Sequence, residues 1–150
     1  MKTFAFALIA TIALTSASVH AHEGHDTPGA LPPPPNGGKL AEASHSAPHA
    51  GGAEETEVFL EGKVDGTKLK IYAHALKDNS FETMNPSSKL VLKELKIEAP
   101  RSKKTTSLSP KTGQGFWEAD IGQQKERRLL VYVTLLDGKE TKTAKIQIEK

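Results

Sequence analysis

The sequence predicts an all-β fold, in which a single small antiparallel β-sandwich of six or seven strands follows a disordered leader. Two observations predict it. Through residues 55–150, short runs of alternating apolar and polar side chains recur about every ten residues, with turn signals between them. Residues 22–54 instead hold six of the nine prolines and only two leucines. Such a segment has too few large apolar groups to offset the entropy lost on ordering.

The first strands of the domain are expected around a tight hairpin. Residues 56–60 begin an extended segment, and Asp65-Gly66 is a strong turn signal before the alternating run of residues 68–73. Residues 77–88 are polar and rich in turn formers. We therefore expect a hairpin followed by a surface connection.

The next element, residues 90–97, contains a break in its alternation. Its leading leucines and its closing apolar residues fall on opposite faces of a regular strand. A β-bulge near Lys93-Glu94 would bring both sets to one face. A helix over residues 88–97 is the alternative, and in either case Pro100 ends the element.

The second half of the domain continues the pattern. Residues 101–115 form a basic connection in which Leu108 fits a short strand. Alternation over residues 116–121, a β-branched run over 128–136 and a final alternating run over 144–148 predict three further strands.

The number and spacing of these strands favour a sandwich of immunoglobulin-like type. His74 has the opposite parity to the apolar positions of its strand, so we expect it to face solvent. The side chains assigned to the core are Leu60, Leu69, Ile71, Leu90, Leu92, Trp117, Ala119, Ile121, Leu129, Val131, Val133, Ile146 and Ile148.

The N-terminus resembles a bacterial export signal. An apolar run over residues 4–14 follows a short positive end, and Val19 and Ala21 form a small-x-small cleavage pattern. We expect residues 1–21 to be a cleavable signal peptide. The run is shorter than the roughly 20 residues that span a bilayer, so a retained anchor is the lesser alternative. The protein is predicted to be periplasmic or secreted, without stable membrane insertion after cleavage.

Composition narrows the classes of function. The formal net charge is +2, so charge gives no reason to expect a nucleic-acid partner. There is no cysteine, which excludes disulfides and thiolate metal sites. No phosphate-binding loop or nucleophile motif occurs, so we do not expect an enzyme. Two connections are basic, and they would form an anion-binding patch if they approach each other. A solvated surface is the alternative. The residues are Arg101, Lys103, Lys104 and Lys111 in one connection, and Lys125, Arg127 and Arg128 in the other.

Histidines carry the one specific chemical pattern. Imidazole and carboxylate groups alternate closely after the predicted cleavage site, and both are ligands for divalent Cu, Ni or Zn. A flexible leader that serves only as a tether is the alternative. The candidate metal ligands are His22, Glu23, His25 and Asp26, with His45 and His49 as further donors.

The leader resembles a known type of segment. Its histidines, its proline tract and its elements Pro35-Asn36-Gly37-Gly38 and 48–52 are similar to the His-rich segments of periplasmic adaptors in heavy-metal efflux systems, where the element is usually Pro-His-Gly-Gly. The alternating strands of the domain resemble the immunoglobulin-like domains of small periplasmic copper-resistance proteins and of the YtkA-like group.

The resemblance implies a periplasmic metal-binding accessory protein for divalent Cu, Ni or Zn, associated with envelope metal handling or efflux. Its partner would be an envelope protein or a metal-efflux component. The alternative is a non-enzymatic immunoglobulin-like interaction module on a flexible leader, with no metal role.

Overall fold

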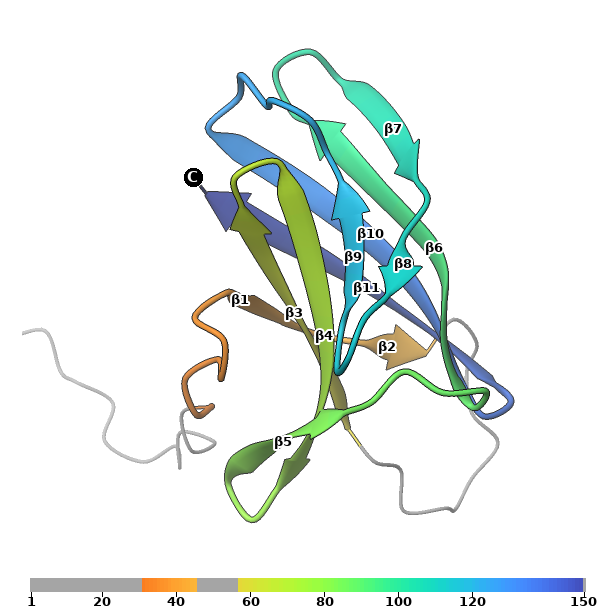
Figure 1. The fold of residues 1–150 in the computed structure, drawn as a ribbon. Helices are drawn as coiled ribbons and strands as arrows, with labels where there is room; N and C mark the ends of the chain where they lie inside the picture. Colours follow the sequence, from red (N-terminus) through yellow and green to blue (C-terminus); the bar gives the residue numbers. More distant parts are fainter. Residues whose placement is uncertain (1–30, 46–56, 150) are drawn as a thin grey trace, which may run out of the picture. The chain divides into compact units, whose positions relative to one another are not determined.

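The computed structural model describes residues 31–45 and 57–149, and their regular structure is entirely β (Figure 1). Within these two ranges there is no helix that could cross a membrane. The predicted signal peptide, residues 1–21, lies outside the described part of the chain.

The first of two antiparallel sheets has β4 at its centre, paired with β3 on one side and with β9 on the other. Its order is β1-β3-β4-β9-β8, and β5 pairs with β4 outside that path. The bounds are β1 (Lys39–Glu42), β3 (Val58–Asp65), β4 (Lys68–Lys77), β5 (Ser80–Met84), β8 (Lys111–Thr112) and β9 (Trp117–Asp120).

The second sheet has the order β2-β11-β10-β6-β7. Its centre is formed by three strands of ten residues each, joined by antiparallel pairing along most of their length. The bounds are β2 (Ser44–His45), β6 (Leu90–Ala99), β7 (Lys104–Leu108), β10 (Arg128–Asp137) and β11 (Glu140–Glu149).

The connectivity confirms the predicted immunoglobulin-like sandwich. Taken in chain order, β3, β4, β6, β8, β9, β10 and β11 correspond to strands A, B, C, D, E, F and G. One sheet then has the order A-B-E-D and the other C-F-G, as in immunoglobulin domains, with β7 beside C. The strands that alternation did not predict are short: β1, β2, β5 and β8.

The core lies between the two sheets and contains every side chain that alternation assigned to it. Leu60, Leu69, Ile71, Leu129 and Val131 have no exposed surface. Burying a side chain of this size stabilises a fold by about 1.5–3 kcal/mol. Because the chain has no cysteine, no disulfide adds to the stability that this apolar layer provides.

The predicted bulge in β6 is present, and the alternative helix over residues 88–97 is wrong. Leu92 pairs with Leu135 and Glu94 with Thr134, so Lys93 is the additional residue. Lys93 and Glu94 are both exposed, while the residues on either side are buried. The bulge thus returns the end of β6 to the core face.

The hairpin turns follow their sequences. Gly66 adopts φ +59° between β3 and β4, as expected from the Asp-Gly signal. Asp78 and Asn79 adopt φ 48° and 60° between β4 and β5. Both side chains tolerate left-handed backbone better than most residues. Residues 77–88, expected as a surface connection, therefore contain a second hairpin that folds β5 against β4.

Residues 31–45 differ from the predicted flexible leader, because they pair with the sandwich. β1 extends the first sheet by pairing with β3, and β2 extends the second by pairing with β11. Between them Ala43 is buried, and its N–H donates to the Val58 carbonyl at 2.8 Å. One short segment therefore crosses from sheet to sheet and covers an edge of each. The rest of the predicted leader, residues 22–30 and 46–54, lies outside the described residues.

Candidate functional site

The predicted metal ligands fall mostly outside the described residues, so the structure places only one of them. His45 ends β2, where its Nδ1 lies 3.8 Å from Oε2 of Glu140. Among residues 31–45 and 57–149, no three His, Asp or Glu side chains form a group that could hold a metal ion. The ligands that lie outside are His22, Glu23, His25, Asp26 and His49.

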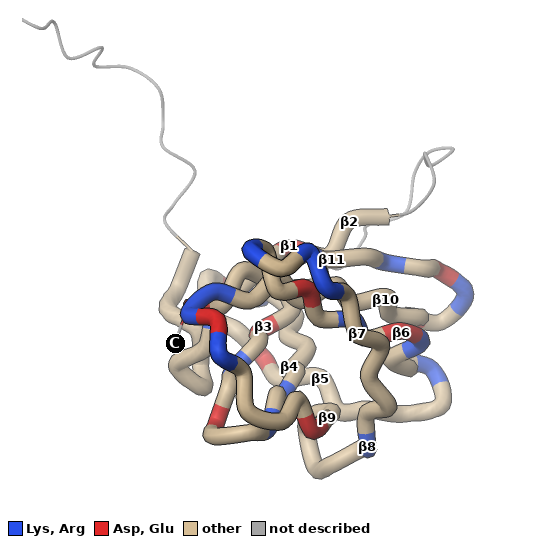
Figure 2. Tube along the Cα trace, turned by 90° about the horizontal axis from the view of Figure 1, so that it is seen from above, with Lys and Arg blue, Asp and Glu red and all other residues tan. Residues whose placement is uncertain are grey.

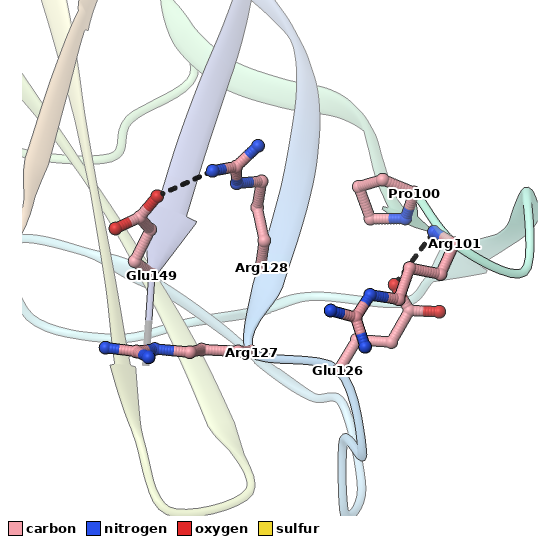
Figure 3. Close-up of a pocket in the computed structure, with 6 residues that line it drawn as sticks. All are labelled: Pro100, Arg101, Glu126, Arg127, Arg128 and Glu149. Carbon is pink, nitrogen blue, oxygen red and sulfur yellow. Dashed lines mark hydrogen bonds and ion pairs between the residues drawn. The ribbon is translucent and has the colours of Figure 1, made fainter.

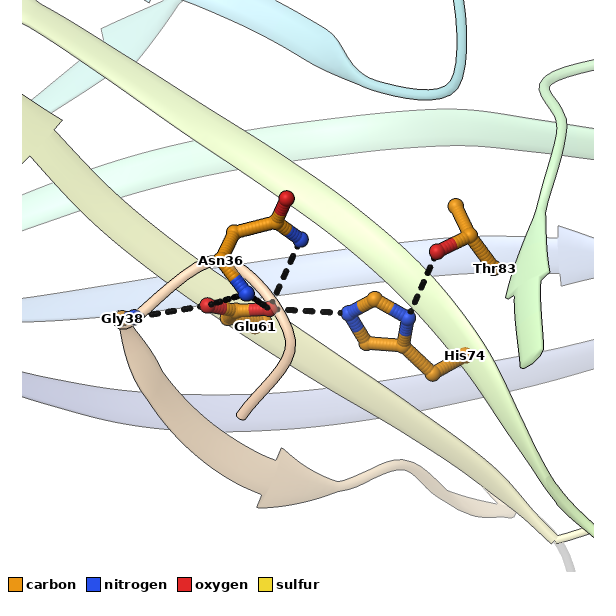
Figure 4. Close-up of polar contacts among 5 residues, drawn as sticks. All are labelled: Asn36, Gly38, Glu61, His74 and Thr83. Carbon is orange, nitrogen blue, oxygen red and sulfur yellow. Dashed lines mark hydrogen bonds and ion pairs between the residues drawn. The ribbon is translucent and has the colours of Figure 1, made fainter. Parts of the chain in front are cut away.

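A buried polar network, which sequence reasoning missed, lies on the outer face of the first sheet (Figure 4). Glu61 of β3 has no exposed surface. Its carboxylate accepts hydrogen bonds from the backbone N–H of Asn36 at 3.1 Å, from Asn36 Nδ2 at 3.0 Å and from the N–H of Gly38. We call this contact between Glu61 and the turn before β1 the clasp.

His74 of β4 completes the network, and its predicted exposure to solvent is wrong. Its side chain is fully buried, with Nε2 2.9 Å from Oε2 of Glu61 and Nδ1 3.3 Å from Thr83 Oγ1. Phe81 of β5 lies beside the ring, at 5.7 Å between centroids. The parity of His74 is as expected, but the β5 hairpin and the clasp cover the face to which it points.

The clasp keeps Glu61 ionised. Burial alone would raise the pKa of this carboxyl group. The hydrogen bonds from Asn36, Gly38 and His74 favour the charged form and together hold the pKa of Glu61 below its ordinary value. An ionised carboxylate only accepts hydrogen bonds, so Nε2 of His74 is the donor in their contact.

The clasp also explains the Pro-Asn-Gly-Gly element, for which the resemblance implied a place in a metal-associated segment. Gly37 has φ +72°, and its N–H donates to the Pro34 carbonyl at 3.1 Å. A Cβ on Gly38 would lie 2.6 Å from the carbonyl oxygen of Gly62 and 2.8 Å from Cγ of Glu61. Both glycines thus allow the turn to present its amides to the buried carboxylate.

The chain Thr83–His74–Glu61 has the order hydroxyl, imidazole, carboxylate that activates nucleophiles in hydrolases. Here, however, the imidazole ring has no exposed surface and both of its nitrogens are engaged. A general base must reach the proton that it removes from a substrate or nucleophile in a bound complex. The arrangement therefore supports a structural role for His74.

The two basic connections do approach each other, at one end of the sandwich. A pocket of about 480 Å³ is lined by Arg101 of the β6–β7 turn, by Arg127 just before β10 and by Arg128, the first residue of β10 (Figure 3). Figure 2 looks onto this end and shows lysine and arginine positions in both segments. Glu126 and Glu149 line the same pocket. We call it the arginine pocket.

Comparisons with known proteins give no relative from which a function could be transferred. No family model matches the chain, and neither a curated protein nor a solved structure matches it. The function must therefore be argued from the residues themselves.

Proposed function

We propose that this protein is a non-enzymatic metal-binding accessory protein of the bacterial cell envelope, which binds divalent Cu, Ni or Zn and serves an envelope metal-handling or efflux component. The observation that carries the proposal is the position of His45. The pairing of β2 with β11 holds its imidazole beside the carboxylate of Glu140.

The distance between the two side chains suits a shared ion. A metal ion that lies about 2.0–2.2 Å from a nitrogen and from an oxygen donor joins atoms up to roughly 4 Å apart. Nδ1 of His45 and Oε2 of Glu140 are 3.8 Å apart, so a shift of a few tenths of an ångström brings them into a tetrahedral arrangement. The side chain of His45 is 21% exposed, so part of it is in contact with solvent.

A positioned pair reduces the entropic penalty of binding. A histidine cluster on a flexible chain must close its own loop around the ion, and loop closure weakens the site. In this protein, by contrast, the pairing of β2 with β11 holds the side chains of His45 and Glu140 close together. His49 follows four residues after His45 and can supply a third donor, and the pair His22 and His25 precedes the docked segment.

A lysine lies next to the proposed metal site, and its charge is paired with a carboxylate. Lys142 is the strand partner of His45 and is almost fully buried. Its ammonium group lies 3.4 Å from Oδ2 of Asp137, which offsets its charge.

Isothermal titration of the full chain with Cu²⁺, Ni²⁺ and Zn²⁺ tests the proposal. We expect binding at micromolar concentration or tighter, weakened about tenfold or more by His45→Ala and less by Glu140→Gln. The matched control is Glu82→Gln, an exposed carboxylate on β5. Equal heats for the wild type and His45→Ala would remove His45 from the site, and negligible heats throughout would refute the function.

The choice of variant matters for the leader histidines. Deleting all residues before Glu55 would also remove β1, β2 and the amides that bind Glu61. Such a truncation would expose a buried carboxylate, so lost metal binding could reflect unfolding. Replacing His22, His25 and His49 by alanine leaves the docked segment intact and is the cleaner test.

A specific feature also favours the alternative function, an interaction module with no metal role. β7 is an edge strand of the second sheet, and its first four residues are exposed. An edge of this kind can pair with an extended segment of a partner protein. If the titrations show no metal binding, replacing Thr106 by proline and testing capture of an envelope partner would examine this reading.

A further inference from the structure

The arginine pocket is separate from the proposed metal site. His45 pairs with Lys142 at the start of β11, whereas Glu149 lines the pocket at the end of the same strand. Seven residues of extended chain span roughly 20 Å. The two sites can therefore be tested independently, and the pocket does not depend on a metal role.

One acidic group in the pocket is occupied by the backbone and by a hydroxyl group. Glu126 accepts from the N–H of Arg101 at 3.0 Å, from the N–H of Ser102 at 3.1 Å and from the Ser102 hydroxyl at 3.0 Å. These contacts hold the pKa of the Glu126 carboxyl below its ordinary value, with the bond from the Arg101 amide as the largest cause. Its acceptor positions are thus largely used for joining two loops.

The remaining carboxylate pairs with only one of the three guanidinium groups. Glu149 accepts from Arg128 at 3.2 Å. Within the described ranges, no hydrogen bond or ion pair joins the guanidinium of Arg101 or of Arg127 to another side chain; Arg101 and Glu126 interact only through the longer-range field. Two guanidinium groups are therefore left to face one pocket.

The bridge through Glu126 keeps these charges in place. It adds to the antiparallel pairing of β6 with β10, which already holds the two segments side by side. An oxyanion that binds there would meet guanidinium groups carried on a fixed pair of segments. Preorganised guanidinium forks are effective partners of oxyanions, since each can donate two parallel hydrogen bonds.

We propose that the arginine pocket binds a phosphate monoester group. The three arginines of the pocket outnumber its two carboxylates by one, which favours an anion. A phosphate monoester has three terminal oxygens that can accept from two guanidinium forks, whereas a carboxylate has only two oxygens. The pocket, of about 480 Å³, has room for an organic body attached to the phosphate. That body is either a small soluble ester or a lipid headgroup.

An NMR titration of the ¹⁵N-labelled full chain tests the site. Inorganic phosphate and glycerol phosphate are the probes, with chloride at matched ionic strength as the reference. We expect the chemical-shift changes to be concentrated at the amides of Arg101, Ser102 and Arg127. The variants Arg101→Ala and Arg127→Ala should each bind phosphate roughly tenfold less tightly than the wild type. Both side chains are exposed, so both variants are expected to fold.

Lys139→Ala is the matched control. It removes the same charge from an exposed turn at the far end of β10, and it should leave phosphate binding unchanged. Arg127→Lys keeps the charge but loses the fork, so it should bind less tightly than the wild type. If Lys139→Ala and Arg127→Ala lost the same amount of phosphate affinity, phosphate would be attracted by overall charge and the proposed site would be overturned. Chemical-shift changes with phosphate that are no larger than those with chloride would also overturn it.

Vesicles distinguish the two sources of the group. Phosphatidic acid displays a phosphate monoester, whereas phosphatidylglycerol displays a singly charged diester. Co-sedimentation with phosphatidic acid that is lost in the double variant Arg101→Ala/Arg127→Ala identifies a lipid headgroup. Binding of glycerol phosphate without co-sedimentation identifies a soluble ester. Failure to bind either probe overturns the proposal.

Discussion

Replacing Glu61 by glutamine is the most direct perturbation of the clasp. The carboxylate receives four donors: two from Asn36, one from Gly38 and one from His74. Glutamine keeps one of the two side-chain oxygens of Glu61 and replaces the other by an N–H₂ group. This N–H₂ group is itself a donor, and it would face the donors that the lost oxygen accepts from in the wild type. At least one donor therefore loses its acceptor: the N–H of Gly38 if the N–H₂ group replaces Oε1, or Asn36 Nδ2 and His74 Nε2 if it replaces Oε2. Each such loss destabilises a protein by about 1–3 kcal/mol.

We therefore expect Glu61→Gln to lower the free energy of unfolding by about 2–4 kcal/mol. This is a large part of the about 5–15 kcal/mol that stabilises a typical domain. Urea unfolding followed by fluorescence of Trp117 measures it, because this single tryptophan is buried in the core. Glu82→Gln, which changes an exposed carboxylate, should stay within about 0.5 kcal/mol of the wild type.

Hydrogen exchange separates local from global effects of Glu61→Gln. If only the docked segment detaches, the Gly38 and Ala43 amides should exchange rapidly while amides of β10 remain protected. Global destabilisation would accelerate exchange of all of them. A variant that loses less than about 1 kcal/mol and keeps the Gly38 amide protected would refute the claim that the clasp holds this segment.

Two further predictions concern the clasp, and a third concerns the core. Folding lowers the pKa of Glu61, so the ionised carboxylate stabilises the fold fully above the unfolded pKa near 4.5. This stabilisation is lost as the pH falls through the folded pKa. The urea midpoint of the wild type should therefore decline over this range, and that of Glu61→Gln should decline less. Gly38→Ala places a Cβ 2.6 Å from the Gly62 carbonyl oxygen and should destabilise by about 1–3 kcal/mol in thermal unfolding. Leu135→Ala, at a fully buried position in β10, should cost about 2–5 kcal/mol in urea unfolding.

Local periodicity was sufficient to predict the sandwich. Alternation identifies the core face of each long strand because the period of a strand is two and one face is buried. The bulge in β6 could also be predicted, since Leu92 and Leu95 cannot share a face in a regular strand. Turn sequences such as Asp65-Gly66 act over four residues and were equally accessible.

The clasp could not be predicted in this way, because it joins residues 25 positions apart in sequence. Periodicity shows which way His74 points but not what covers that face. A signal was nevertheless present: Phe59 and Tyr72 have the same outward parity as Glu61 and His74. Aromatic side chains on a supposedly exposed face indicate a cover, here β5 and the turn before β1.

The docking of residues 31–45 had even less local signal. The segment has few apolar side chains, and composition alone places it with flexible leaders. Its order arises instead from backbone pairing with two sheet edges and from amides that satisfy Glu61. These partners lie elsewhere in the chain, so a compositional argument cannot weigh them.

The clasp and the proposed metal donor belong to one continuous segment, and this links their energetics. His45 keeps its place beside Glu140 only while β2 stays paired with β11. The pairing of β2 covers only two residues, too few to hold the segment by themselves. The pairing of β1 with β3 and the contacts of Glu61 with Asn36 and Gly38 hold the rest of the same segment. A metal bound at His45 would in turn stabilise the docked segment, because a ligand that binds only the docked form favours that form.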